Sequence, residues 1–170
     1  AIDDVITKGM PYEGWTDKAG NYHKGFLDQF DDIVKRHGWE HNGGRNWRAR
    51  IIYQTNIDTA YAAGRYKQMT DKDTLKVFPY WRYVHADRRI PLNPREQHEA
   101  WDNLVLRADD NFWLTHYPPN AWKCSCGVEN LSQSDLELMG KSGPDKAPKI
   151  EFEKRRDPAT DEWINYPKGV

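Results

Sequence analysis

The residues of this chain best suited to chemistry lie close together, between Pro94 and Cys126. Cys124 and Cys126, the only cysteines in the sequence, are separated by one serine, and His98 and His116 precede them. Thiolate and imidazole groups are the ligands that zinc prefers in proteins, usually four of them in a tetrahedron. The pattern therefore predicts a zinc site formed by Cys124, Cys126, His98 and His116, which would fasten the surrounding loops together.

The same residues leave other interpretations open. His85 is a further candidate for the fourth ligand, and a single Cys-x-Cys motif indicates metal less strongly than paired Cys-x-x-Cys motifs do. Without metal, the cysteines would be buried, reduced thiols and the histidines hydrogen-bonded core residues. The cysteines are too close in sequence for an ordinary structural disulfide, and reduced thiols are typical of a cytoplasmic setting.

The stretch also has a superficial likeness to the zinc deaminases, which use His-x-Glu and Pro-Cys-x-x-Cys motifs. Here Glu99 directly follows His98, so on a helix the two side chains point about 100° apart. The cysteines also have one residue between them rather than two. The spacing argues against deamination.

Composition excludes several classes of protein. The 170 residues carry a net charge of −1, so no global field draws the chain to nucleic acid or membrane. Mean hydropathy is −0.97, yet the sequence has 8 Trp and 9 Tyr, which predicts a small core built from aromatic rings. No apolar run approaches the ~20 residues of a membrane span.

Because the chain begins without Met and ends without a clear element, we expect a fragment of a longer protein.

Arginines and aromatic rings gather in one stretch. Such groups can contact a partner or a single strand of nucleic acid, although arginine stems covering rings at a solvated edge would give the same pattern. The residues predicted to contact a partner are Tyr80, Trp81, Arg82, Arg88 and Arg89.

Hydrophobic periodicity indicates the elements that must position these residues. It predicts helices over 22–37, 45–69, 94–101 and 133–139, strands over 80–85 and 104–106, and an extended segment over 122–128. The fold class is therefore α+β: N-terminal helices, then a short-stranded region that metal would staple, then a C-terminal hairpin. We expect one domain over 1–140, helical over 21–70 and mixed over 78–140, a linker over 141–149, and the hairpin within 150–170.

The same periodicity predicts which side chains are buried. In the helix over 45–69, Ile51 and Tyr66 are expected on the apolar face, with Arg48 and Arg65 mostly outside it. Four tryptophans are expected in the core: Trp47, Trp101, Trp113 and Trp122.

Several segments together resemble one known family. The segment at 53–69, YQTNIDTAYAAGRYKQM, is similar to the characteristic helix of this family. Three further motifs of the family follow in order: R-x-x-H at 95–98, DD-x-F-W at 109–113 and PPN-x-W-x-C-x-C at 118–126. The resemblance is to the phage Mu protein F-like minor head proteins, also called phage head morphogenesis proteins, and it extends roughly over 5–170. The family's cysteine pair is often C-R-C, whereas Ser125 stands in the middle here, so an arginine that binds DNA is not expected at that position.

The resemblance implies a structural minor capsid protein, in the virion and, during assembly, in the host cytoplasm. Portal protein and capsid or scaffold proteins are its implied partners, with possible contact to packaged DNA and none to membrane, and we expect a monomer in isolation. The alternative is a toxin-type enzyme domain that acts on nucleic acid or by ADP-ribosyl transfer. The sequence offers no Ser-His-Asp set and no glycine-rich phosphate loop, so we expect no enzyme. A plain DNA-binding module is disfavoured by the neutral charge.

Overall fold

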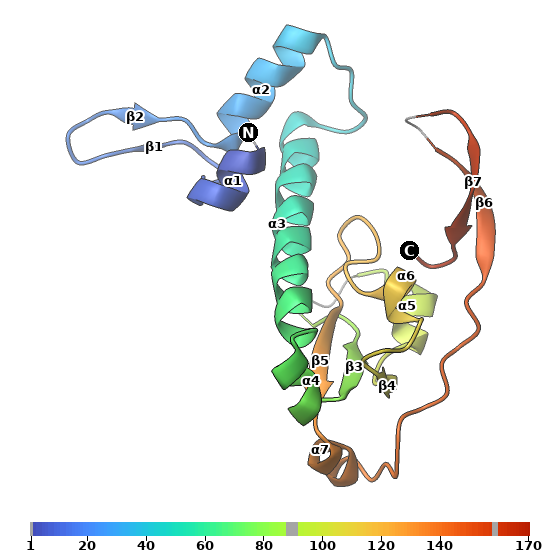
Figure 1. Cartoon of the computed structure of the whole chain (residues 1–170). Helices are drawn as coiled ribbons and strands as arrows, with labels where there is room; N and C mark the ends of the chain where they lie inside the picture. Colours follow the sequence, from blue (N-terminus) through green and yellow to red (C-terminus); the bar gives the residue numbers. More distant parts are fainter. Residues whose placement is uncertain (1, 88–91, 158–159) are drawn as a thin grey trace. The chain divides into compact units, whose positions relative to one another are not determined.

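The computed structural model describes residues 2–87, 92–157 and 160–170 (Figure 1). Within these ranges the fold is α+β, as predicted, with helices and small antiparallel sheets. The chain divides into two compact units, 1–61 and 62–170. Their boundary falls inside the longest helix, where the sequence shows no linker. No helix in the described ranges combines the length and the apolar composition needed to cross a bilayer.

The first unit is built from helices and one very small sheet. It holds α1 (Ile2–Lys8), β1 (Trp15–Thr16), β2 (Tyr22–His23), α2 (Phe26–His37) and the first part of α3 (Arg45–Met69). Among the described residues, its core cluster contains the buried side chains of Val5, Phe26, Phe30 and Ala49. The helix predicted over 22–37 is therefore present from Phe26, and it ends as expected at His37, followed by Gly38, whose φ of 57° is left-handed.

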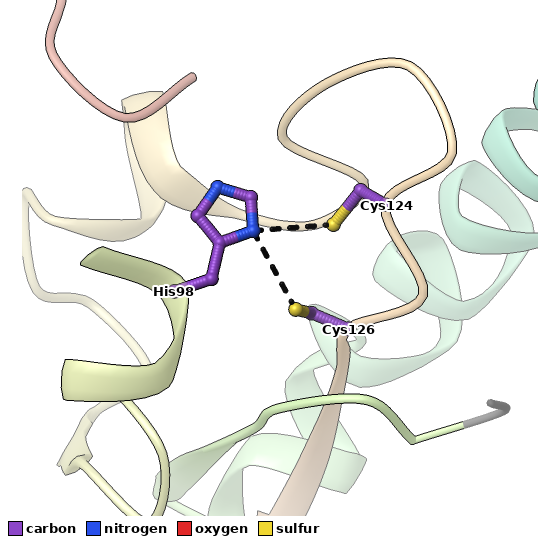
Figure 2. Close-up of side chains that lie close together, drawn as sticks. All are labelled: His98, Cys124 and Cys126. Atoms are coloured by element: carbon purple, nitrogen blue, oxygen red, sulfur yellow. Dashed lines mark hydrogen bonds between the residues drawn. The ribbon is translucent and has the colours of Figure 1, made fainter. Parts of the chain in front are cut away.

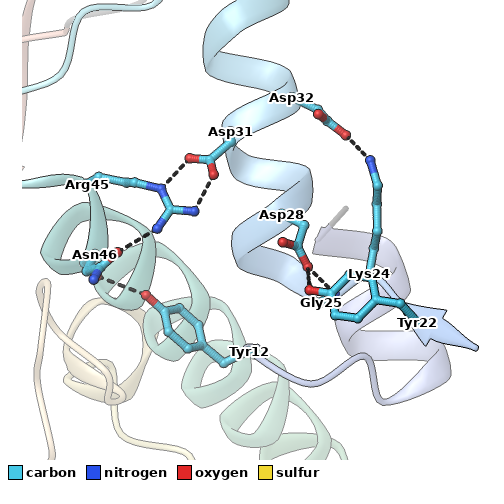
Figure 3. A network of polar contacts seen from close by, with 9 residues as sticks. All are labelled: Tyr12, Tyr22, Lys24, Gly25, Asp28, Asp31, Asp32, Arg45 and Asn46. Atoms are coloured by element: carbon cyan, nitrogen blue, oxygen red, sulfur yellow. Dashed lines mark hydrogen bonds and ion pairs between the residues drawn. The ribbon is translucent and has the colours of Figure 1, made fainter. Parts of the chain in front are cut away.

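Polar contacts fix both the start of α2 and its pairing with α3 (Figure 3). The Asp28 carboxylate accepts hydrogen bonds from the Gly25 backbone N–H at 2.9 Å and from the Tyr22 hydroxyl at 2.8 Å. It thereby satisfies a backbone donor at the helix N-terminus. Arg45 forms a two-pronged ion pair with Asp31. Because both partners of this pair are partly exposed, it fixes geometry more than it adds stability.

Helix α3 has the predicted bounds, but its apolar face is only partly covered. Ile51 is buried, as expected, whereas Trp47 is 50% and Tyr66 36% exposed, so the prediction that these two rings are buried was wrong. The Arg48 guanidinium lies 5.1 Å from the Trp47 ring centroid. Tyr66 packs edge-on against Trp81, and this contact covers only part of the Tyr66 ring.

The second unit contains the end of α3, four shorter helices and two sheets. Its elements are α4 (Lys72–Val77), β3 (Tyr80–Val84), α5 (Glu96–Ala100), β4 (Val105–Arg107), α6 (Trp113–His116), β5 (Gly127–Leu131), α7 (Gln133–Leu138), β6 (Phe152–Arg156) and β7 (Trp163–Pro167). β3 lies at the centre of a three-stranded antiparallel sheet of order β4-β3-β5. β6 and β7 form the predicted C-terminal hairpin.

Aromatic side chains fill the core of this unit. Alternate residues of β3 face inward, and Trp81 and Tyr83 have no exposed surface. Trp101 and Trp113 are buried, as predicted. Trp122 is 58% exposed, so the prediction that it is a core residue was wrong. Lys123, whose φ of 60° is left-handed, follows Trp122. The chain turns there, so the exposed Trp122 and the buried Cys124 point in different directions.

Side chains occupy both edges of the three-stranded sheet. On β4, the Val105 N–H donates to the Asp145 carboxylate at 2.9 Å, and the Asp145 N–H donates to the Val105 carbonyl at 2.7 Å. On β5, the Val128 carbonyl accepts from the Arg65 guanidinium at 3.4 Å. The segment predicted as a linker over 141–149 has neither helix nor strand. The two bonds of Asp145 attach it to β4.

Candidate metal centre

One short helix and one loop bring three potential metal ligands together. His98 lies on α5, and Cys124 and Cys126 lie on the loop that leads into β5. All three side chains are buried, with exposed fractions of 1%, 3% and 4%. Alternate residues of an extended segment point to the same side, and Figure 2 shows both cysteine sulfurs directed at the His98 ring. The Cys-x-Cys spacing is therefore what allows both thiols to face one imidazole.

The donor atoms lie at distances suited to a bound ion. His98 Nδ1 is 3.7 Å from the sulfur of Cys124 and 3.7 Å from that of Cys126, and the three donor atoms lie within 4.8 Å of one another. With Zn–S bonds of about 2.3 Å and Zn–N bonds of about 2.0 Å, tetrahedral angles place sulfur and nitrogen about 3.5 Å apart. The arrangement thus fits a shared tetrahedral ion as well as it fits S–H···N hydrogen bonds.

The second nitrogen of His98 sets the tautomer of the ring. His98 Nε2 lies 2.7 Å from the backbone carbonyl oxygen of Gly169. A carbonyl oxygen only accepts, so Nε2 carries the hydrogen and, in the neutral ring, Nδ1 presents its lone pair to the sulfurs. Metal-bound histidines are oriented in this way by a carbonyl or carboxylate behind the ring.

The two buried thiols titrate as a pair, because a hydrogen bond joins them. A hydrogen bond with Cys126 lowers the pKa of Cys124, and His98 acts in the same direction, against the effect of burial. The same bond between the thiols raises the pKa of Cys126, as does burial. Burial also raises the pKa of the neighbouring Tyr83, and the charge of the sulfurs adds to this effect. The pair therefore favours one thiolate, and a thiolate is the form of cysteine that binds metal.

His116 is not brought to the sulfurs. Its Nδ1 lies 2.7 Å from the Thr115 hydroxyl, its Nε2 lies 3.3 Å from the Lys168 carbonyl oxygen, and its ring stacks on Phe112. Burial lowers the pKa of the imidazole, which favours the neutral form. His116 is buried like the other three predicted ligands, but the geometry gives it the role of a hydrogen-bonded core histidine.

His85 lies closer to the thiols than His116 does. Its Nδ1 is 3.6 Å from the Cys126 sulfur. It also lines, with the three ligands above, a hollow of about 390 Å³. The hollow is a path by which an ion from solvent could reach the buried sulfurs.

The arginine–aromatic stretch is only partly available to a partner. Trp81 has no exposed surface, because its ring is part of the core, and so it is removed from the predicted contact. Tyr80 is half-buried and its hydroxyl donates to Gln133, while Arg82 is paired with Glu129. Arg88 and Arg89 lie outside the described residues.

The site has one participant that sequence reasoning missed. The carbonyl that holds the His98 ring belongs to the backbone of Gly169, so the residue type could not predict this contact. The structure shows why a glycine stands at 169: its φ is 90°, and a Cβ there would lie 2.8 Å from the Trp101 ring. The chain can approach α5 this closely because the position has no side chain.

Comparisons with known proteins agree with the segments noted in the sequence. Residues 6–129 match the family model described as phage Mu protein F like protein. This range includes His98, Cys124 and Cys126, and it ends within β5. No solved structure matches the chain significantly.

Two curated relatives are similar to it. The putative capsid assembly protein F of Escherichia phage Mu is 45% identical over 93 residues, which are 55% of this chain and 20% of that protein. The Mu-like prophage FluMu F protein of Haemophilus influenzae (strain ATCC 51907 / DSM 11121 / KW20 / Rd) is 35% identical over 131 residues, 71% of this chain and 30% of that protein. The chain therefore spans less than a third of either relative. With a family model matching well over half of its residues, the chain belongs to the phage Mu protein F-like family.

Proposed function

We propose that this chain acts structurally in the head morphogenesis of a phage or Mu-like prophage, as part of a minor head protein. The supporting observation is family membership, together with a relative named for capsid assembly. Its partners are then the portal protein and the capsid or scaffold proteins, met in the host cytoplasm, with possible contact to packaged DNA. Before assembly the protein is a monomer, and afterwards it is part of the virion.

We further propose that zinc, held by Cys124, Cys126 and His98, stabilises the second unit. The donor set is soft and buried, and it joins α5 to the loop before β5. Metal that binds only the folded chain adds its binding free energy to stability. Such a staple suits a unit whose helices after α3 are all short.

A structural rather than enzymatic role is also supported by the surroundings of His98. Glu99, which a deaminase-like mechanism would need as a proton shuttle beside the metal, is exposed on α5 while His98 is buried. The carboxylate therefore lies on a different side of the helix from the thiols. We assign no proton transfer to this site.

The head function can be tested in the parent phage. Deleting the gene should abolish or deform heads, and complementation with the wild-type gene should restore them with the protein present in purified particles. Electron microscopy and quantitative mass spectrometry provide the two measurements. Normal, infectious heads formed without the protein would overturn the proposal.

The metal can be tested on the purified protein independently of heads. We expect about one zinc per chain by mass spectrometry of metals, and a lower melting temperature after chelation. The Cys124→Ser, Cys126→Ser double variant should bind no zinc and should not respond to chelator. Protein that purifies without metal, takes up none from zinc solution and melts unchanged with chelator would rule out the staple.

A further inference from the structure

Extending the β3–β5 register by one pair would bring His85 opposite Cys126. β3 and β5 pair in antiparallel register, with Tyr83 opposite Val128 and Val84 opposite Gly127. These are the last paired residues, and His85, which begins a turn, and Cys126 lie one step beyond them. Directly opposite residues project to the same face of a sheet, and in β3 that face is the buried one, occupied by Tyr83. The register therefore explains why His85 Nδ1 comes within 3.6 Å of the Cys126 sulfur.

Two contacts fix the segment around His85, one with the residues after α5 and one with the start of β5. The His85 N–H donates to the Asp102 carboxylate at 2.8 Å. Beyond it, Ala86 turns the chain with φ 53°, and Asp87 passes so close to Gly127 that a Cβ there would lie 2.6 Å from its carboxylate. The backbone at His85 is thus positioned, while its half-buried ring borders the hollow and has room to turn.

We propose that His85 is the fourth protein ligand, giving a closed site of two thiolates and two imidazole nitrogens for a tetrahedral divalent ion, zinc above all. This inference rests on the zinc site proposed above. His85 is not one of the three donors that already lie within 4.8 Å of one another, so its ring turns toward the ion on binding. Structural zinc sites take four protein ligands, whereas catalytic sites keep a position for water. A fourth ligand therefore makes the site structural.

Cobalt(II) is the probe, because its visible absorption reports both tetrahedral geometry and the number of thiolate ligands. His85→Ala should weaken zinc binding more than about tenfold in a chelator competition and should alter the cobalt spectrum. His116→Gln is the matched control: it changes the other nearby histidine and should leave metal affinity and spectrum unchanged. His85→Cys should restore tight binding and add the charge-transfer absorption of a third thiolate, a gain that a merely structural role for His85 would not produce.

The outcomes separate the inference from the proposals that it extends. Wild-type affinity and spectrum in His85→Ala would overturn the fourth-ligand assignment while leaving a three-ligand site. Loss of binding in His116→Gln but not in His85→Ala would transfer the role to His116. A wild-type protein that binds neither zinc nor cobalt would overturn both the zinc site and the fourth ligand, but the head function would still depend on the particle experiment.

Discussion

At the residue scale, the candidate site depends on how one imidazole is held at both of its nitrogens. Nδ1 of His98 faces the two sulfurs, and Nε2 meets the Gly169 carbonyl. The carbonyl can reach the ring only because Gly169 fits against Gln97 and Trp101 with no side chain of its own. A change at Gly169 therefore tests the support of the metal site without touching a ligand.

Gly169→Ala should destabilise the protein and weaken metal binding. An alanine at φ 90° is strained, and its Cβ would meet the Gln97 side chain at 2.7 Å and the Trp101 ring at 2.8 Å. Gly140→Ala is the control, because Gly140 also has a left-handed φ, 71°, with nothing within 4 Å of an added Cβ. Strain alone should cost about 1 kcal/mol in both variants, so an equal loss of unfolding free energy, with unchanged zinc affinity, would show that the contact at Gly169 is unimportant.

At the element scale, α7 shows how a short helix is fixed by its first turn. The Ser132 hydroxyl accepts from the Asp135 N–H at 3.2 Å, and the Asp135 carboxylate accepts from the Ser132 N–H at 2.7 Å. This reciprocal pair satisfies orphan donors at the N-terminus of the helix. The helix carries Leu136, which is fully buried beside β4 and β5, so the cap also positions part of the core.

Ser132→Ala should lower the free energy of unfolding by about 0.5–2 kcal/mol, because the Asp135 N–H loses its acceptor. Ser134→Ala, two residues on in the same helix and exposed, should change it by less than about 0.5 kcal/mol. Chemical denaturation of the two variants measures the difference. Equal values would mean that the cap contributes nothing beyond helix propensity.

The elements that sequence could predict are those with a strong local pattern. The bounds of α3, the end of α2 at His37 and the start of α7 at Gln133 were all predicted, because each depends on nearby residues. α4 was missed: it is six residues long, and its Asp71 cap precedes only Leu75 as a partly buried residue packed against the core. The exposure of Tyr66 and Trp122 was missed because periodicity indicates a face but not what covers it. The Cys-x-Cys motif and His98 could be grouped by residue type, whereas choosing between His85 and His116 required the β3–β5 register.

At the scale of the whole molecule, the two units should respond differently to metal. Every proposed ligand lies in the unit of residues 62–170. The first unit has its own core, which among the described residues contains the buried side chains of Val5, Phe26, Phe30 and Ala49. Loss of the metal should therefore loosen one unit and leave the interior of the other intact.

Hydrogen exchange followed by mass spectrometry can measure this difference. Chelator should speed exchange in α5 and β5, because their metal link is lost, and should leave α2 unchanged. The Cys124→Ser, Cys126→Ser variant should exchange fast in the same segments without chelator and show no further change with it. An equal rise in α2 would contradict the independence of the two cores.

The side chains on the two edges of the three-stranded sheet bear on solubility. Unpaired strand edges invite another chain to add a strand, which is a common route to aggregation. Here Asp145 bonds both backbone groups of Val105 on β4, and Arg65 bonds a carbonyl of β5. In the head function proposed above, blocked edges would keep this sheet from nonspecific β-pairing with the surrounding chains. Light scattering at raised concentration should accordingly show Asp145→Ala aggregating while Asp109→Ala, a change at an exposed carboxylate near the same strand, stays clear.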